Sequence, residues 1–283
     1  MVILNFELNG EKRPLYMDNE LDNQIDKRVI PAVQKKDFDY FLTIDGQEGS
    51  GKSVFAMQLA KRLDPNFSVD QIAFTPQEFI KCVVNAKKFQ CILFDEAFTG
   101  LSSRSSLSEI NQLLVALMME CRQRNLFVII CMPSVFMLDK YVVLHRTKGL
   151  FHVYMSNGRR GFWRFYNRKR LKPMYIKGKK YYEYGGAKAV LFGRFRDQYT
   201  IDETEYRARK KKALVKKQRT TKAQQYKAQR DVLFYILHKD MKQSYRNTEK
   251  LCKNYGYSVG RSTISDIITS KSKEILQEDQ LSG

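Results

Sequence analysis

The segment at positions 46–53 combines flexible glycines with one cation and one hydroxyl group. Its sequence is GQEGSGKS; an apolar run over 38–44 precedes it, and a helical pattern of apolar residues follows it. Glycines allow successive backbone N–H groups to turn toward one anion, and the N-terminus of the following helix adds partial positive charge. The spacing therefore predicts a loop that binds the phosphates of a nucleotide. Its residues are Gly46, Gln47, Glu48, Gly49, Ser50, Gly51, Lys52 and Ser53.

Two residues of this loop, and two acids further along the chain, have distinct predicted roles. A lysine at the position of Lys52 reaches the β- and γ-phosphates, and the adjacent hydroxyl of Ser53 holds Mg²⁺. Asp95 and Glu96 end an apolar run that begins at Cys91. We expect Asp95 to bind Mg²⁺ through water, and Glu96 to orient and deprotonate the attacking water. The predicted cofactors are thus ATP and Mg²⁺, the alternative being a strand that ends in two acids by chance.

Strand and helix patterns alternate through this part of the chain. Apolar runs typical of buried strands occupy 38–44, 71–74, 91–94, 126–131 and 150–155. Apolar spacing predicts helices after the loop, over 76–88, and over 107–124. Thr75 and Glu78 have the spacing of a capping box at the start of the second helix. This alternation favours an α/β fold with a mainly parallel central sheet. Ser134, after the fourth strand, either senses the γ-phosphate or begins the next turn.

Over 38–155 these motifs resemble the P-loop ATPases that have an extra strand and a catalytic glutamate. That class includes RecA, the AAA+ ATPases, and the HerA/FtsK-type DNA translocases and viral packaging motors. The matching segments are GQEGSGKS at 46–53, ILFDEA at 92–97, LFVIIC at 126–131, and Arg146 before the fifth strand. The serine-rich segment 102–106 and the RQRN sequence before strand four most resemble small phage and plasmid ATPases of the zonular-occludens-toxin and packaging kind. The resemblance implies a RecA-like core with ATPase activity.

Arginines are expected near the site because members of this class share ATP across subunit interfaces. A neighbour's arginine there stabilises the charge of the transition state. The resemblance implies this role for Arg146, because AAA+ proteins carry that residue before the fifth strand. Arg124, Arg122 and Arg104 are alternatives, and each could instead form a surface ion pair. The resemblance also implies a homo-oligomer, of which a ring is one form.

Charge is distributed unevenly along the chain. The 283 residues have a net charge of +20, and 43% are hydrophobic, enough for a substantial core. Residues 1–150 contain 18 basic and 18 acidic residues, whereas 151–283 contain 32 and 12. The asymmetry predicts a neutral globular module joined to a module that binds a polyanion, with DNA as the partner of residues 156–283. The alternative is a solvated basic face.

The basic half has three predicted parts. Aromatic residues and arginines alternate over 158–170, which predicts a strand that either stacks on bases or packs half-buried, with a hairpin over 175–184. Residues 201–230 predict an exposed basic helix or a flexible linker. Helices expected over 248–255 and 261–270 resemble a helix-turn-helix, the alternative being a plain helical hairpin.

The expected organisation therefore has five parts. At the N-terminus we expect a hairpin that turns at Asn9 and Gly10, then a short helix interrupted at Pro31. The predicted segments are an N-terminal extension (1–37), a P-loop ATPase core (38–155), a basic β-rich extension (156–200), a basic linker or helix (201–230) and a helix-turn-helix-like DNA-binding module (231–283).

The remaining sequence features bear on the cellular compartment of the protein. No apolar run is long enough to span a bilayer, and the N-terminus lacks the order of a signal peptide. No pair of the five cysteines has the spacing of zinc ligands. We therefore expect no membrane partner and a cytoplasmic protein with free thiols (in the host cytoplasm if the protein is viral).

Three functions are consistent with these sequence features. An ATP-hydrolysing DNA-binding motor or switch uses every feature, with packaging, transfer and replication left open. A nucleoside monophosphate kinase is the first alternative, because GQEGSGKS also resembles the loop of thymidylate kinase. The adjacent Asp95 and Glu96 and the basic half instead favour water as the acceptor. An ATP-gated DNA-binding regulator is the second alternative, against which Glu96 argues.

Overall fold

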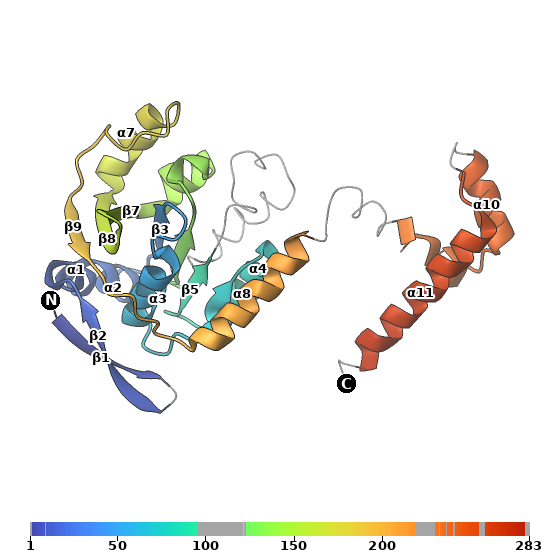
Figure 1. The fold of residues 1–283 in the computed structure, drawn as a ribbon, viewed down its shortest axis with the longest axis horizontal. Coiled ribbons are helices and arrows are strands. Elements are labelled where there is room, and N and C mark those ends of the chain that lie inside the picture. Colours follow the sequence, from blue (N-terminus) through green and yellow to red (C-terminus); the bar gives the residue numbers. More distant parts are fainter. Residues whose placement is uncertain are drawn as a thin grey trace. The chain divides into compact units, whose positions relative to one another are not determined.

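The structure is a computed structural model in which the chain divides into two compact units, Met1–Lys211 and Lys212–Gly283 (Figure 1). It describes residues 2–8, 10–95, 121, 123–218, 230–231, 233–235, 237–239, 241–254 and 258–280. The predicted helix over 107–124 lies almost entirely outside these residues, as do Glu96, Arg104, Arg122 and the serine-rich segment 102–106.

One mixed sheet organises the first unit. In the described residues it has seven strands in the order β4-β5-β6-β3-β7-β8-β9. Their bounds are β3 Tyr40–Gly46, β4 Ile72–Ala73, β5 Cys91–Phe94, β6 Phe127–Cys131, β7 Thr147–Ser156, β8 Arg159–Asn167 and β9 Leu191–Arg194. The first five strands in this order are parallel, and β8 and β9 add antiparallel pairs at one edge. The predicted α/β fold with a mainly parallel sheet is confirmed.

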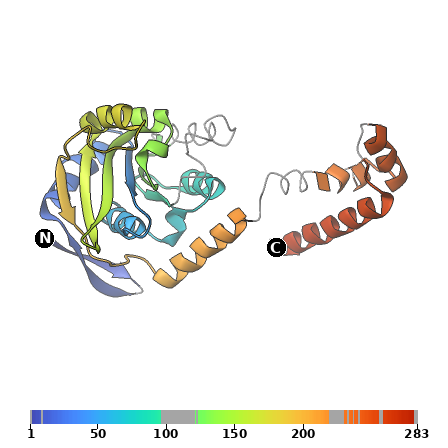
Figure 2. The ribbon, with the colours of Figure 1, turned by 45° about the horizontal axis from the view of Figure 1, so that its top comes forward.

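Helices cover both faces of this sheet (Figure 1 and Figure 2). Successive strand residues point to opposite faces, and β7 shows the division. Phe151 meets Phe55 of α3 (Lys52–Leu63) with ring centroids 5.2 Å apart. Leu150 belongs to the core cluster on the other face, with Phe79 of α4 (Pro76–Asn85) and Tyr175 of α7 (Arg168–Gly178). The sheet is therefore buried on both sides at its centre.

The N-terminal segment packs beside this sheet. Strands β1 (Val2–Leu8) and β2 (Glu11–Met17) form the predicted hairpin, with Gly10 at φ 80° in the turn. One continuous helical stretch follows, made of α1 (Asn19–Gln24), a π-helical turn (Ile25–Val29) and α2 (Ile30–Gln34). Pro31 lies directly after the point where the π-helical turn changes to the α-helix α2, and it does not interrupt the stretch.

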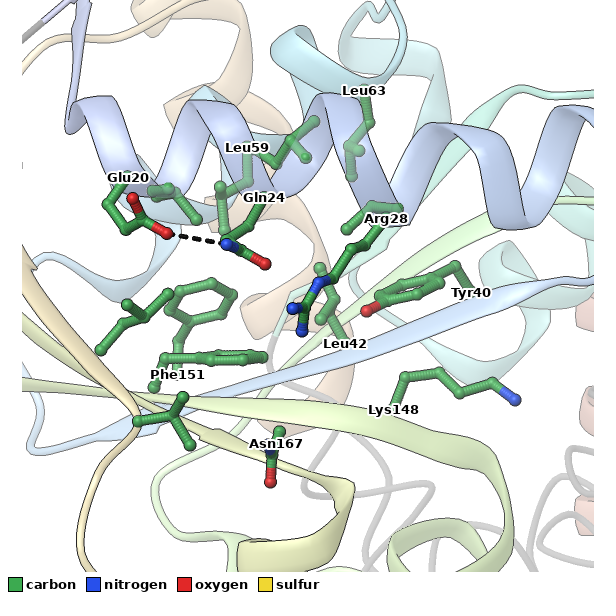
Figure 3. Close-up of a pocket in the computed structure, with 16 residues that line it drawn as sticks. Glu20, Gln24, Arg28, Tyr40, Leu42, Leu59, Leu63, Lys148, Phe151 and Asn167 are labelled. Carbon is green, nitrogen blue, oxygen red and sulfur yellow. Dashed lines mark hydrogen bonds between the residues drawn. The ribbon is translucent and has the colours of Figure 1, made fainter.

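A cavity of about 270 Å³ lies between this helical stretch and the sheet (Figure 3). Its floor is apolar, with Leu42 and Phe151 among the lining residues, and the polar residues Arg28 and Tyr40 lie together on one side. The lining residues of β3 and α3 come from the start of the strand and the end of the helix. The cavity is thus at the opposite end of both elements from the phosphate loop.

Residues 156–200, predicted as a basic β-rich extension, contain two strands of the core sheet. Strands β8 and β9 extend the sheet of the core, so the expected boundary after residue 155 falls inside that sheet. The predicted hairpin over 175–184 is wrong, because α7 runs to Gly178 and residues 179–184 contain turns and no strand. Asn167 Oδ1 accepts a hydrogen bond from the Arg170 N–H at 3.1 Å and caps this helix. Leu171, Met174 and Tyr175 are buried at helical spacing, a signal that the basic residues between them obscured.

The second unit contains α10 (Tyr245–Asn254) and α11 (Arg261–Gln280). Its described core is small and consists of Phe234, Ile264 and Ile268. In α10, Leu251 is 40% exposed, whereas Cys252 packs on the core. Residues 255–257 of the turn lie outside the described residues, so the helix-turn-helix stays a prediction.

None of the helices in the described residues combines the length and the apolar character that a membrane span requires.

The cap of α7 provides a test of the corrected region. We expect Asn167→Ala to lower the free energy of unfolding by about 1 kcal/mol, because the helix loses a side-chain acceptor for an unpaired N–H. Asn167→Asp keeps an acceptor and should retain most of the stability. Urea unfolding of the full chain measures both. Equal stability of Asn167→Ala and the wild type would contradict the capping role.

Candidate functional site

The phosphate loop joins β3 to α3, in the strand–loop–helix setting that the sequence predicts. Gly46, Gly49 and Gly51 have φ values of 142°, 75° and 94°, a region that favours glycine. A Cβ on Gly46 would lie 1.9 Å from the carbonyl oxygen of Val153 in the neighbouring strand β7. The pairing of β3 with β7 therefore requires glycine at the start of the loop.

Inside the loop, Lys52 folds back over the backbone. Its Nζ donates to the carbonyl oxygens of Gly46 and Gln47, both at 2.8 Å. Burial lowers the pKa of this ammonium group. Ser50 Oγ is buried and has no hydrogen-bond partner among the described residues. An ammonium group and an unused buried hydroxyl suit a loop that receives phosphate oxygens.

The two residues predicted to hold Mg²⁺ are in contact. Ser53 Oγ, in the first turn of α3, lies 3.0 Å and 3.1 Å from the two carboxylate oxygens of Asp95. Asp95 follows β5 and is 2% exposed. A hydroxyl and a carboxylate beside a phosphate loop are the hard oxygen donors that Mg²⁺ prefers. These residues fit the metal, while Glu96, the next residue, lies outside the described part of the chain and its catalytic role stays a prediction.

Two further residues, which sequence reasoning missed, contact the same carboxylate. They come from α8 (Glu203–Gln218), the segment predicted as an exposed helix or a linker. Tyr206 Oη donates to Asp95 Oδ2 at 2.7 Å, and Lys210 Nζ lies 3.1 Å from the same oxygen. Burial is the larger cause that raises the pKa of Tyr206, and the nearby negative charge of Asp95 raises it further. The hydroxyl therefore keeps the proton that it donates. The four-residue spacing of Tyr206 and Lys210 places both on one side of a helix, but the sequence does not show that this side meets Asp95.

A strap over 195–202 carries the chain from β9 across α3 to α8. Gln58 Nε2 of α3 donates to the carbonyl oxygens of Arg196 at 2.7 Å and Gln198 at 2.8 Å. Thr200 Oγ1 donates to the carbonyl oxygen of Met57 at 2.9 Å. All of these side chains or backbone groups belong to one compact unit, so α8 starts from a fixed position beside the phosphate-loop helix.

A second buried carboxylate lies directly before the loop. Asp45 Oδ2 accepts from the Val135 N–H at 2.7 Å and from Tyr184 Oη at 2.5 Å. Asp45 Oδ1 lies 2.8 Å from His152 Nδ1 of β7. Ser134 Oγ lies 3.2 Å from Tyr184 Oη and begins a 3₁₀ turn over Val135–Met137. The structure thus places Ser134 at the start of the next turn, one of the two roles left open, and joins it to this network.

Arg146, predicted to act on a neighbouring subunit's nucleotide, forms an intramolecular pair in the described structure. Its guanidinium contacts the Asp39 carboxylate and lies 4.7 Å from the centroid of the Phe41 ring. Asp39 and Phe41 lie at the start of β3, whereas the phosphate loop follows its end. A role in trans would require Arg146 to leave Asp39, and that role stays a prediction.

The other arginines have different positions. Arg124 Nη1 donates to the Ala86 carbonyl at the end of α4, at 2.7 Å. An arginine that was not predicted, Arg160 of β8, lies closer to the loop. A Cβ on Gly49 would lie 3.9 Å from its guanidinium. Arg160 is therefore the cation that antiparallel extension of the sheet adds next to the phosphate loop.

The glycine geometry yields a matched pair of variants. We expect Gly46→Ala to destabilise the protein by more than about 3 kcal/mol, because the new methyl group overlaps backbone rather than a movable side chain. Gly49→Ala should destabilise the protein by only about 1–2 kcal/mol, because its positive φ is unfavourable for alanine but no backbone atom is in the way. Chemical denaturation of both variants measures the difference. A smaller loss for Gly46→Ala than for Gly49→Ala would contradict the described contact with β7.

Residues 27–143 match the family model described as Novel STAND NTPase 3. No curated protein matches the chain in sequence.

Two solved structures are similar at low scores. The N-terminal domain of zonular occludens toxin from Neisseria meningitidis is 14% identical, covers 60% of this chain and 98% of its own, and has a TM-score of 0.36. The genome packaging NTPase B204 from Sulfolobus turreted icosahedral virus 2, in complex with ATP-gammaS, is 11% identical, covers 46% and 93%, and has a TM-score of 0.33. Scores this low support no inference about function. The family match confirms the predicted P-loop class, and the matched residues, which are similar to STAND-type P-loop NTPases, hold the phosphate loop and Asp95.

Proposed function

We propose that this protein hydrolyses ATP with Mg²⁺ and uses the cycle to act on DNA as a motor or switch. One observation supports the hydrolytic part more than any other: Ser53 and Asp95 meet at 3.0 Å beside the phosphate loop. These two residues come from different strand–helix units and are 42 positions apart in sequence. Their contact assembles a metal site where the terminal phosphates of a nucleotide would enter.

The residues have separate tasks in this proposal. Mg²⁺, when bound, neutralises phosphate charge and orients the γ-phosphate for in-line attack. Ser53 and Asp95 hold it, and Lys52 compensates phosphate charge from within the loop. Glu96, covalently next to Asp95, takes the proton of the attacking water. With two adjacent acids at the end of one strand, Asp95 binds the metal and Glu96 accepts the proton.

Substitution of the acid and the lysine tests the hydrolytic part. We expect Glu96→Gln to retain nucleotide binding while turnover falls by about 10² to 10⁴, since it removes a general base. Lys52→Ala should weaken nucleotide binding itself. Phosphate release and fluorescent-nucleotide binding by the full chain measure the two effects.

Three outcomes would redirect this proposal. Wild-type turnover in Glu96→Gln would refute the assignment of the base. Phosphate transfer to an added nucleoside monophosphate, in place of hydrolysis, would favour the kinase alternative. Slow turnover with tight nucleotide-dependent DNA binding would favour an ATP-gated regulator.

The DNA part of the proposal rests on the basic half of the sequence and on one exposed face of the sheet. Cations and aromatic rings alternate there over β7, β8 and β9. Arg194 lies 4.7 Å from the Phe162 ring, and Arg164 lies 4.8 Å from the Tyr154 ring. Phe162 and Tyr154 stack with centroids 5.7 Å apart. Phe192 on the same strand as Arg194 is 79% exposed.

This aromatic–arginine face (Tyr154, Phe162, Arg164, Phe192 and Arg194) suits single-stranded nucleic acid. Flat rings stack on bases whatever their identity, and guanidinium groups neutralise the backbone. The other face of β8 fits the alternative considered from sequence, since Trp163 is buried against Phe55. One face of this strand thus matches the half-buried interpretation, and we assign the base-stacking role to the other face.

A pair of phenylalanine variants tests the face. We expect Phe192→Ala to weaken binding to a single-stranded oligonucleotide by about 1–3 kcal/mol, the value of one stacked base. Phe38→Ala is the control, because Phe38 is also exposed beside a cation but lies elsewhere. Fluorescence anisotropy at several salt concentrations measures both. Equal affinities of the two variants, or binding by the wild type that does not fall with salt, would contradict this part of the proposal.

A further inference from the structure

The carboxylate of Asp95 is more heavily engaged than a metal ligand alone requires. Ser53 Oγ, Tyr206 Oη and Lys210 Nζ all lie within 3.1 Å of its oxygens. Asp95 is buried, so its charge needs compensation from within the protein. Lys210 supplies a full positive charge at the oxygen Oδ2. The described structure thus neutralises this residue with a side chain from α8.

Lys210 and Mg²⁺ cannot occupy this carboxylate together at low cost. Mg²⁺ and the water molecules that it binds need carboxylate lone pairs that Lys210 and Tyr206 use, and the two cations would repel strongly in a buried site. From this geometry we propose that α8 is a latch: Tyr206 and Lys210 hold Asp95 in a metal-free state, and Mg²⁺ binds when they release it. This inference rests on the proposed function, since it names the regulation of the same site.

The latch is built into the fold rather than formed by one long side chain. The Tyr206 ring is buried and lies 5.7 Å from Phe74 and 5.9 Å from Tyr199, centroid to centroid. Arg209 Nη1 donates to the Val69 carbonyl at 2.7 Å, which fixes α8 beside the segment that leads into β4. The strap over 195–202 fixes the start of the helix from the other side. Release of Asp95 therefore requires movement of α8 or a rotamer change of both residues.

The exposed side of the same helix indicates what releases it. Arg207, Lys211 and Lys212 are exposed and flank Lys210 in sequence. Phosphates of a nucleic acid that bind these cations would also attract Lys210, and they would compete with Asp95 for its ammonium group. We therefore assign DNA as the releasing ligand, so that DNA binding promotes metal loading of the nucleotide site.

The test is a Mg²⁺ titration of nucleotide binding by the full chain, followed by the anisotropy of a fluorescent ADP analogue. We expect Lys210→Gln to lower the Mg²⁺ concentration for half-maximal effect by about tenfold or more, because it leaves a buried charge that only the metal then neutralises. Tyr206→Phe should also lower this Mg²⁺ concentration, but by a smaller factor. Lys210→Arg keeps the charge and should resemble the wild type.

Lys211→Gln is the matched control, because it removes the same charge from the adjacent, exposed position of α8. Its Mg²⁺ requirement should equal that of the wild type. Thermal melting in EDTA checks that each variant is folded. A shift in Lys211→Gln as large as that in Lys210→Gln, or an increased Mg²⁺ requirement in Lys210→Gln, would refute the latch.

A second arm repeats the titration with a saturating oligonucleotide. DNA should lower the Mg²⁺ requirement of the wild type and have little effect on Lys210→Gln, in which the latch is already open. No effect of DNA on the wild type would overturn its role as the releasing ligand. Absence of nucleotide binding by the wild type would refute the proposed function itself, whereas normal binding with an unchanged Mg²⁺ requirement in Lys210→Gln would refute the latch alone.

Discussion

A buried anion must be compensated, and in this protein that requirement is concentrated at Asp95. Its carboxylate follows β5, faces the start of α3, and is approached by α8 from a distant part of the sequence. Removing one partner of a buried ion pair is costly because the other charge remains in a poorly polarisable environment. The positions of α3 and α8 relative to β5 are therefore coupled through one side chain. The strap over 195–202 makes that coupling possible by carrying the chain around α3.

Asp45 repeats this arrangement two strands along the sheet, with β6 between β5 and β3. It is fully buried, and it binds the Val135 N–H, Tyr184 and His152. Three segments that are distant in sequence thus converge at the end of β3, directly before the phosphate loop. Together the two carboxylates fix both ends of the loop. Asp45, at its start, binds β7 and the turn after β6, and Asp95 binds Ser53 at its end, where α3 begins. The loop between them holds the Lys52 ammonium group over its own backbone and a buried Ser50 hydroxyl with no hydrogen-bond partner among the described residues.

The boundary between the neutral and the basic part of the sequence does not coincide with the boundary between the two compact units. The net charge of the first 150 residues is zero and the excess lies in the remainder, yet the first compact unit continues to Lys211. Basic residues of β8, β9 and α8 are therefore part of the nucleotide-binding unit. This arrangement brings Arg160 close to Gly49 and Lys210 into contact with Asp95. A polyanion bound by these segments would act directly on the nucleotide site, without a signal from a separate domain.

Local sequence determined the features whose physics is local. The glycines of 46–53 predicted the loop because few other residues adopt positive φ, and the apolar runs predicted β3, β5 and β6 because parallel strands are buried on both faces. The N-terminal hairpin followed from its turn residues, whereas the short helix α7 was missed because its apolar positions lie between basic ones.

Tertiary structure decided what depends on contacts between distant residues. No pattern within 201–218 shows that Tyr206 and Lys210 reach Asp95, more than 100 positions away in sequence. Arg146 could be placed before a strand from sequence, but its pair with Asp39 arises only when β3 and β7 become neighbours. The amino-acid sequence by itself thus determined the nucleotide-binding chemistry, because that chemistry is built from one contiguous loop and one strand end. The folded chain decided how the charges of that site are compensated, because compensation depends on distances in space that residue spacing does not encode.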